Sequence, residues 1–93
     1  MMNNEFVREQ ATAMAKRILA TKLDYPSRLN LAYHLTLGRP ATDAERKRAN
    51  QYLLSEAKAI IPLKGGNKDT ASQLAWATFC QALFASAEFR YLN

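Results

Sequence analysis

The sequence is poor in the residues from which most chemical sites are built. Among 93 residues it has one cysteine, Cys80, and one histidine, His34. A single cysteine excludes an internal disulfide bond. His34 has no second histidine, cysteine or carboxylate at ligand spacing, so we interpret it as a surface or hydrogen-bonded histidine. We predict no catalytic residue, no metal ligand and no cofactor, and we expect that this chain is not an enzyme.

Long apolar runs and phosphate-binding glycine patterns are also missing. No apolar run reaches the length of a membrane-spanning helix, and the first ten residues, MMNNEFVREQ, lack the character of a signal peptide. Gly65 and Gly66 lie in the segment PLKGGNKD, which has no Walker spacing and no preceding strand, and which we interpret as a flexible loop. The sequence therefore gives no sign of a membrane-spanning segment or of a nucleotide-binding loop.

The composition that remains is that of one small globular domain. Hydrophobic residues make up 48% and charged residues 23%, and 93 residues are enough to bury a core. We therefore assign residues 1–93 to a single domain. Because the chain begins almost inside its first helix, we expect it to be a piece of a larger protein.

Helical periodicity runs through almost the whole chain, and no segment alternates like a strand. We expect helices from Asn3 or Asn4 to Thr21 or Lys22, from Pro26 to Leu37, from Asp43 to Ile60 or Ile61, and from Asp69 or Thr70, where Thr70 and Gln73 form a capping box. Ser86 is expected to cap a last short turn. The predicted fold is all-α: a compact bundle of four helices with a short C-terminal helical turn.

The stretch at residues 29–45, LNLAYHLTLGRPATDAE, contains the best-defined local signals. Gly38 is expected to take a left-handed conformation after the second helix, and Pro40 prevents that helix from resuming. Thr42 and Glu45 have the spacing of a capping box at the start of the third helix. We predict that Arg39 is structural, and that it bonds helix C-terminal carbonyls or pairs with Glu45 or Glu88.

Two helices have more apolar surface than one core contact needs. The second has a strip at Leu31 and Leu35 beside its main face, which predicts a central position. The fourth has a small-residue face and a bulky face; the small face consists of Ala71, Leu74, Ala75, Thr78 and Ala82, and the bulky face of Trp76, Phe79, Cys80 and Leu83. Two central helices leave too few residues to cover them, so we predict an exposed docking patch of Phe6, Trp76, Phe79, Leu83 and Phe84. The alternative is that the C-terminal turn folds back and buries it.

Three segments resemble a known family: NNEFVREQA, LAYHLTLGRPATDAER and FCQALFASAEFRYLN. They are similar to the C-terminal part of a planctomycete domain family of unknown function, most closely at residues 4–11, 37–40 and 86–93. The resemblance implies a large exported or periplasmic parent protein, which sometimes also contains a cytochrome-c-like haem domain. This chain departs from the family in having Ala41 where a second proline is common, and it has no Cys-x-x-Cys-His to attach a haem. The resemblance implies no catalytic residue.

Three functions stay open. The first is a non-catalytic helical module that docks on upstream domains of its parent or on a protein partner, with a weak homodimer as a variant. The second is a small nucleic-acid-binding domain, supported by the net charge of +5 but opposed by the acids at the start of the third helix. The third is part of an enzyme site completed upstream, to which Asp43, Glu45 and Glu88 would contribute. We favour the first, and no small-molecule substrate is evident.

Overall fold

The computed structural model describes the backbone of residues 4–92 and the side chains of residues 5–87. Its elements are α1 (Asn4–Ala20), α2 (Tyr25–Leu37), α3 (Asp43–Ile60), the short 3₁₀ helix η1 (Ile61–Lys64) and α4 (Lys68–Leu92). No strand occurs in the described backbone. The predicted all-α helical bundle is therefore confirmed, although no separate C-terminal turn is present, because α4 continues through Ser86 to Leu92.

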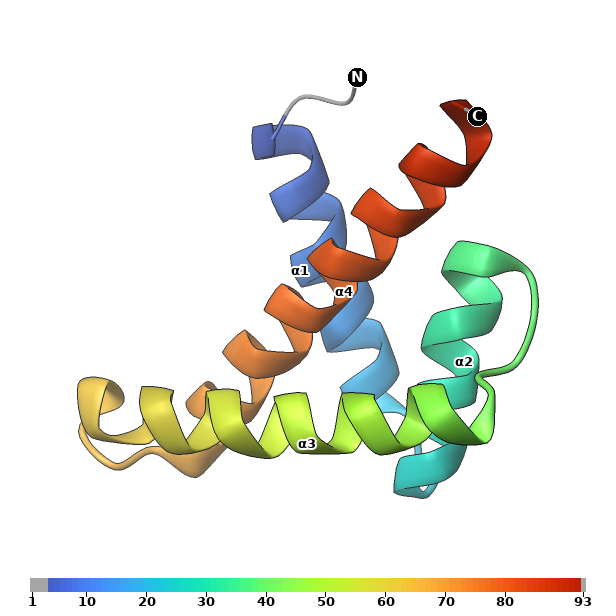
Figure 1. Ribbon diagram of the computed structural model, residues 1–93. Coiled ribbons are helices and arrows are strands. Elements are labelled where there is room, and N and C mark those ends of the chain that lie inside the picture. Colours follow the sequence, from blue (N-terminus) through green and yellow to red (C-terminus); the bar gives the residue numbers. More distant parts are fainter. Residues whose placement is uncertain (1–3, 93) are drawn as a thin grey trace.

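The other three α-helices are arranged around α4 (Figure 1). α1 and α4 cross each other, α3 runs across the lower end of this pair, and α2 stands beside α1. α4 contacts each of the other three α-helices, and its largest interface is with α1. Within residues 4–92, none of the helices is both long enough and apolar enough to cross a membrane.

One face of α4 supplies the centre of the core. Its buried residues are spaced so that they lie on a single side of the helix: Ala71, Ala75, Trp76, Phe79, Cys80, Leu83 and Ala87. Ile18 of α1 and Leu29 of α2 are fully buried against the same core. The predicted stripe of α1 (Val7, Ala11, Met14 and Ile18) is buried as expected.

The predicted central position of α2 is wrong. α2 buries Leu29, Ala32 and Tyr33, and Leu31 of the second strip only partly, whereas the side chain of Leu35 is 40% exposed. α2 has 13 residues and α4 has 25, so the longer helix can contact all its neighbours at once. The small-residue face of α4 is also divided, because Ala71 and Ala75 are buried while Leu74, Thr78 and Ala82 face solvent.

Two helix starts differ from the predictions because an unexpected residue caps each of them. Asp24 accepts a hydrogen bond from the Ser27 N–H at 2.9 Å, so α2 begins at Tyr25 rather than at Pro26. Asn67 accepts a hydrogen bond from the Thr70 N–H at 3.0 Å, so α4 begins at Lys68. Thr70 is thus inside the first turn, and its predicted capping box is wrong. The segment predicted as a flexible loop is partly ordered by η1.

Gly38 has φ 73°, as predicted, and its N–H donates to the His34 carbonyl at 3.0 Å. Apart from Gly38 itself and its two chain neighbours, no described residue has an atom within 4 Å of the position that a Cβ would occupy there. We predict that Gly38→Val destabilises the fold by about 1–2 kcal/mol, through left-handed backbone strain rather than a clash. Gly38→Asn is the matched control and should lose less, since asparagine tolerates this conformation. Urea denaturation measures both; a Val variant as stable as the parent would contradict the prediction.

Candidate functional site: the α2–α3 turn and the groove beside α2

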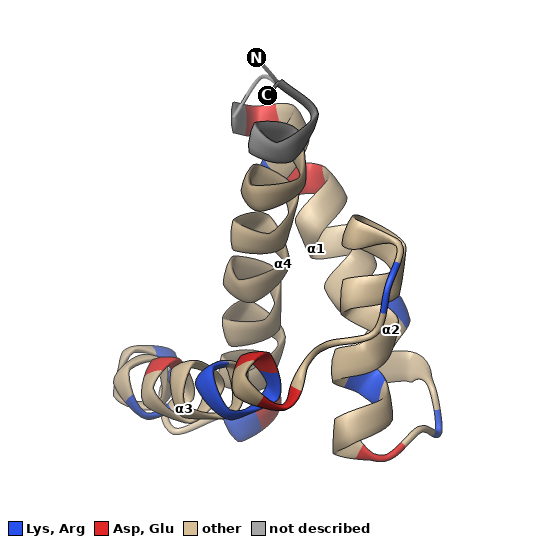
Figure 2. Ribbon diagram, turned by 45° about the vertical axis from the view of Figure 1, so that its right-hand side comes forward, with Lys and Arg blue, Asp and Glu red and all other residues tan. Residues whose placement is uncertain are grey.

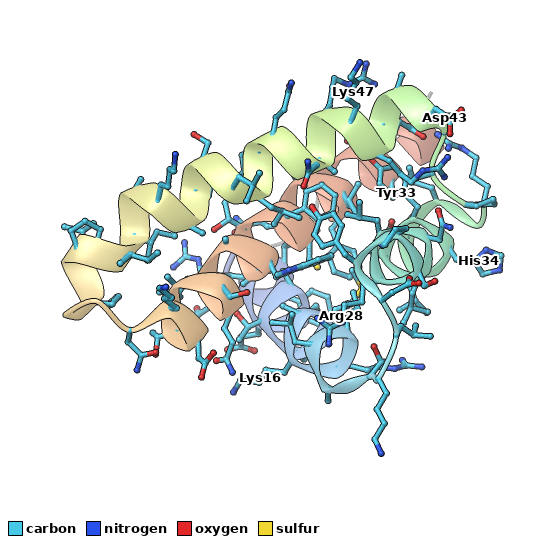
Figure 3. The ribbon with its side chains drawn as sticks, turned by 90° about the horizontal axis from the view of Figure 1, so that it is seen from below. Lys16, Arg28, Tyr33, His34, Asp43 and Lys47 are labelled. Atoms are coloured by element: carbon cyan, nitrogen blue, oxygen red, sulfur yellow. The ribbon has the colours of Figure 1, made fainter. Side chains whose placement is uncertain are left out.

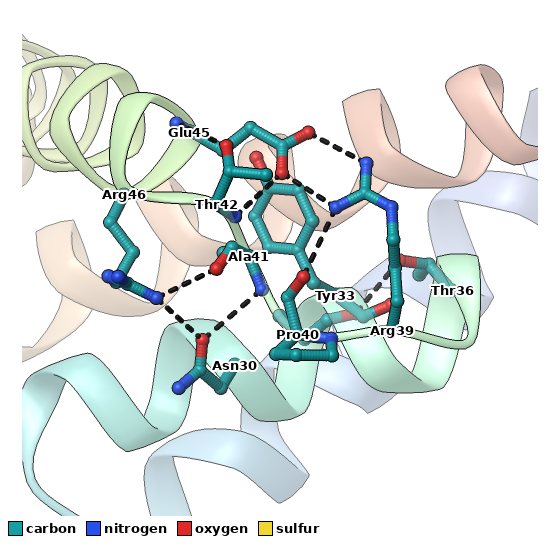
Figure 4. A network of polar contacts seen from close by, with 10 residues as sticks. Asn30, Tyr33, Thr36, Arg39, Pro40, Ala41, Thr42, Glu45 and Arg46 are labelled. Atoms are coloured by element: carbon teal, nitrogen blue, oxygen red, sulfur yellow. Dashed lines mark hydrogen bonds and ion pairs between the residues drawn. The ribbon is translucent and has the colours of Figure 1, made fainter.

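The carboxylate of Glu45 holds the turn between α2 and α3, residues 38–42, by accepting several hydrogen bonds (Figure 4). Thr42 Oγ1 accepts from the Glu45 N–H at 3.1 Å, and the Thr42 N–H donates to Glu45 Oε1 at 2.9 Å, which completes the predicted capping box. The Arg39 guanidinium donates to both oxygens of Glu45, at 2.7 and 2.9 Å. Arg39 also donates to the Pro40 carbonyl at 3.1 Å. The geometry therefore contains the Arg39–Glu45 pair that the sequence led us to expect.

A second set of bonds on the other side of this turn was not anticipated. Asn30 Oδ1 accepts from the Ala41 N–H at 3.2 Å and from Arg46 Nη1 at 3.4 Å. Arg46 Nη1 also donates to the Ala41 carbonyl at 2.7 Å, and its other terminal nitrogen pairs with Asp43. The only sequence signal was the position of Asn30 between two leucines, Leu29 and Leu31. Arg46 thus holds the turn, whereas its neighbour Lys47 points away from α3 (Figure 3).

Aromatic side chains connect the turn to the core. The Arg39 guanidinium lies 5.9 Å from the ring centroid of Tyr33, and Tyr33 lies 6.2 Å from Phe79. Phe79 also contacts Tyr52 of α3 and packs edge-on against Trp76, with centroids 6.2 and 5.8 Å apart. α2 and α3 each contribute a tyrosine to the same phenylalanine of α4, so the angle between the two helices determines whether this cluster closes.

The predicted docking patch is therefore wrong in its centre. Trp76 is 4% exposed, and Phe79 and Leu83 are each 6% exposed. Tyrosines of α2 and α3 pack against the rings of Trp76 and Phe79. Phe84 is half-buried, and Phe6 is 50% exposed. The alternative, in which the last residues fold back over the patch, involves side chains outside the described range. The structure does not bring the five predicted residues together on one surface.

A groove lies instead between α1, α2 and the C-terminal half of α4. It has a volume of about 280 Å³. Met14 and Ala13 of α1 contribute to its apolar lining, together with Leu35 of α2 and Phe84 of α4. The polar lining residues are Gln10 and Arg17. We call this set of six residues the α1–α2 groove. Sequence reasoning identified Phe84 and the extra strip on α2 that contains Leu35, but it did not join them.

Arg28 is a further polar residue whose role the sequence did not reveal. Its Nη2 donates to the carbonyls of Leu19 and Thr21, at 3.2 and 3.0 Å, so it satisfies the C-terminal end of α1. Arg28 and Tyr33 lie among the helices, while His34 points away from α2 (Figure 3). His34 is exposed, in line with its interpretation as a surface histidine.

The pKa shifts of three ionisable side chains are explained by hydrogen bonding and burial within the fold. The hydrogen bonds from Arg39 lower the pKa of Glu45 to about 2. Burial raises the pKa of the Cys80 thiol to about 12, so this thiol stays protonated and unreactive. Burial likewise raises the pKa of Tyr33. In the described part of the chain, no three residues of the types that bind metals form a group suited to a metal ion.

Charge is mixed on the surface of α3 (Figure 2). Asp43 and Glu45 occupy its first turn, where a recognition helix would approach nucleic acid. Arg46 is engaged with Asp43 and with the Ala41 carbonyl. The run Arg46-Lys47-Arg48 therefore does not form one basic surface, because its first member faces the turn.

These features define the class: a small all-α module whose polar contacts hold a turn between two helices. The chain belongs to the PSD1 family, described as a protein of unknown function (DUF1553), which matches residues 1–53. The matched region contains α1, α2 and the first part of α3, including residues 4–11 and 37–40. The third segment of the resemblance, residues 79–93, lies outside it. No curated protein and no solved structure matches the chain.

We predict that Arg39→Ala lowers the melting temperature by about 2–5 °C, because it removes the pair with Glu45 and the contact with Tyr33. Lys47→Ala is the matched control, since Lys47 is exposed and points into solvent. Its melting temperature should stay within about 1 °C of the parent. Equal melting temperatures for the two variants would argue against a structural role for Arg39.

A second prediction concerns pH. The folded-state pKa of Glu45, about 2, lies below its ordinary value of 4.5, so the unfolded chain binds the proton more readily. The stabilisation is therefore present above pH 4.5 and is lost as the pH falls from about 4.5 to about 2. Allowing for partial exposure and screening, Glu45→Gln should cost about 1 kcal/mol at pH 7. Urea denaturation at several pH values should show this difference shrinking below pH 4.5; a constant difference would contradict it.

Proposed function

We propose that this chain is a non-catalytic helical module that docks on another part of its parent protein or on a protein partner. The observation that carries the proposal is the α1–α2 groove, in which Leu35 is 40% exposed beside the half-buried Phe84. Apolar side chains gathered at a hollow between helices are typical of a docking surface. The proposed interaction surface is therefore the α1–α2 groove and not the patch predicted from the sequence.

The family context supports an intramolecular version of the same function. The resemblance places similar domains after other domains in large exported proteins, some with a cytochrome-c-like domain. We extend the proposal to an exported or periplasmic parent protein of planctomycete origin. In that setting, a module of this size would bury the α1–α2 groove against a neighbouring domain.

Two other functions have weaker support. Nucleic-acid binding has the net charge of +5 in its favour, but Asp43 and Glu45 precede any basic residue on α3. A contribution to an enzyme site would use the same two carboxylates, yet each is already paired with an arginine. The side chain of Glu88, the third residue considered, lies outside the described range. A salt-dependent mobility shift with duplex DNA would favour the nucleic-acid alternative over docking.

Photo-crosslinking in the natural gene product tests the docking function. A photoreactive p-benzoylphenylalanine replaces Leu35 in one variant and Leu54 in a matched control, because Leu54 is 61% exposed on α3, away from the groove. We expect one dominant adduct from position 35, whose cross-linked peptide, once sequenced, maps to one protein segment, and no such adduct from position 54. Equal or absent adduct formation at the two positions would overturn the proposal.

A further inference from the structure

We propose that the connection between α3 and α4, residues 57–68, binds the surface of an anionic lipid bilayer, with Leu63 inserted among the headgroups and lysines against them. This surface shares no residue with the α1–α2 groove, so the inference goes beyond the docking function. It follows from the exposure of Leu63, from the charge around it, and from the position and hydrogen bonding of the turn that presents it.

Leu63 is the most exposed large apolar residue in the described part of the chain, at 79%. It lies in η1, and its neighbour Pro62 is exposed as well. A single exposed leucine is common on protein surfaces and needs no function of its own. The surroundings of Leu63 distinguish it from the other exposed leucines of this chain.

The segment around Leu63 contains lysines and no acid. Residues 57–68 have the sequence AKAIIPLKGGNK, in which Lys58, Lys64 and Lys68 are all exposed. None of the three takes part in an ion pair with another described residue. Because η1 packs against both α3 and α4, these lysines lie around one turn. An anionic surface that approaches the turn therefore meets three unpaired ammonium groups.

The connection also forms a protruding end of the molecule. Figure 1 and Figure 3 view the molecule from different sides, and in both of them the end of α3 and the start of α4 meet at its left-hand extremity. No other helix extends beyond this end in either view. A protruding turn can touch a flat surface such as a bilayer while the rest of the chain stays in water.

The backbone of the turn is hydrogen-bonded internally. The N–H groups of Gly65 and Gly66 donate to the Ile61 carbonyl, and the Asn67 N–H donates to the Lys64 carbonyl at 3.2 Å. Polar groups that are already paired lose less free energy on leaving water than free ones do. The exposed leucine can therefore enter the headgroup region without taking these backbone donors there unpaired.

The apolar residues favour a bilayer over a nucleic acid as the partner. Lysines attract any anionic surface, but residues 57–68 have no aromatic ring to stack on a base and no arginine to read one. Leu63 gains little beside phosphate groups, whereas a bilayer removes its apolar area from water. With one leucine and three lysines, the binding is weak and reversible.

Vesicle sedimentation with the whole chain measures the interaction. Vesicles of equal parts phosphatidylcholine and phosphatidylglycerol are compared with vesicles of phosphatidylcholine alone. We expect binding to the anionic vesicles to be at least about tenfold tighter, since each lysine near an anionic surface contributes about fivefold. Added salt should weaken this binding, because it screens the lysines.

Two triple variants separate the local charge of the turn from the net charge of the chain. The first changes Lys58, Lys64 and Lys68 to glutamine and should weaken binding to the anionic vesicles by about a hundredfold. The matched control removes the same net charge through three other exposed lysines: Lys16, Lys22 and Lys47. It should lose less than about fivefold. Circular dichroism shows whether each variant keeps its helices.

A fluorescent label tests insertion at position 63. Leu63→Cys provides a site for a nitrobenzoxadiazole probe, and the buried Cys80 stays unlabelled. The matched control is Leu23→Cys, because Leu23 is 43% exposed in the connection between α1 and α2, next to Lys22. With anionic vesicles, emission from position 63 should rise and shift to shorter wavelength as the probe leaves water. Emission from position 23 should not change.

Four results overturn the inference. The first is equal or absent binding to the two kinds of vesicle, and the second is an equal loss in the two triple variants, which reduces the effect to net charge. The third is unchanged emission from position 63, which means adsorption without insertion. The fourth is a mobility shift with duplex DNA that the triple variant of the turn abolishes, without vesicle binding, which makes the partner a nucleic acid.

Discussion

Burial of one face of α4 is the constraint on which the rest of the structure depends. Cys80, near the middle of that face, is fully buried, as are Ile18 of α1 and Leu29 of α2. No pair of these helices can shield such a face alone, because a helix covers only a strip of its neighbour. α1, α2 and α3 therefore all pack on α4.

The α2–α3 turn fixes how α2 and α3 are oriented as they pack on α4. Its bonds join residues of α2, the turn and the start of α3: Asn30, Arg39, Ala41, Thr42, Glu45 and Arg46. With the turn held, Tyr33 and Tyr52 both reach Phe79. The ionisable side chains of the turn thus have a structural role. The lowered pKa of Glu45 results from the hydrogen bonds that it accepts there.

The same packing leaves the α1–α2 groove open. α2 is too short to cover α1 and α4 completely, and Leu35 lies on the side of α2 that the core does not use. The groove is therefore a consequence of how three helices meet on α4. Its apolar lining is the basis for proposing a docking role.

The sequence by itself determined the elements and their local signals. Helical periodicity, the left-handed Gly38 and the Thr42–Glu45 capping box were all predictable, because each depends on residues a few positions apart. The caps at Asp24 and Asn67 also depend on nearby residues, but Pro26 and Thr70 favoured later helix starts in the sequence. Only the tertiary structure decided which apolar residues were covered. Trp76, Phe79 and Leu83 looked surplus on a single helix and are core residues. The tyrosines that pack on Trp76 and Phe79 come from α2 and α3. Leu35 and Phe84 looked unrelated and share a groove, because periodicity identifies the apolar side of a helix but not the neighbour that covers it.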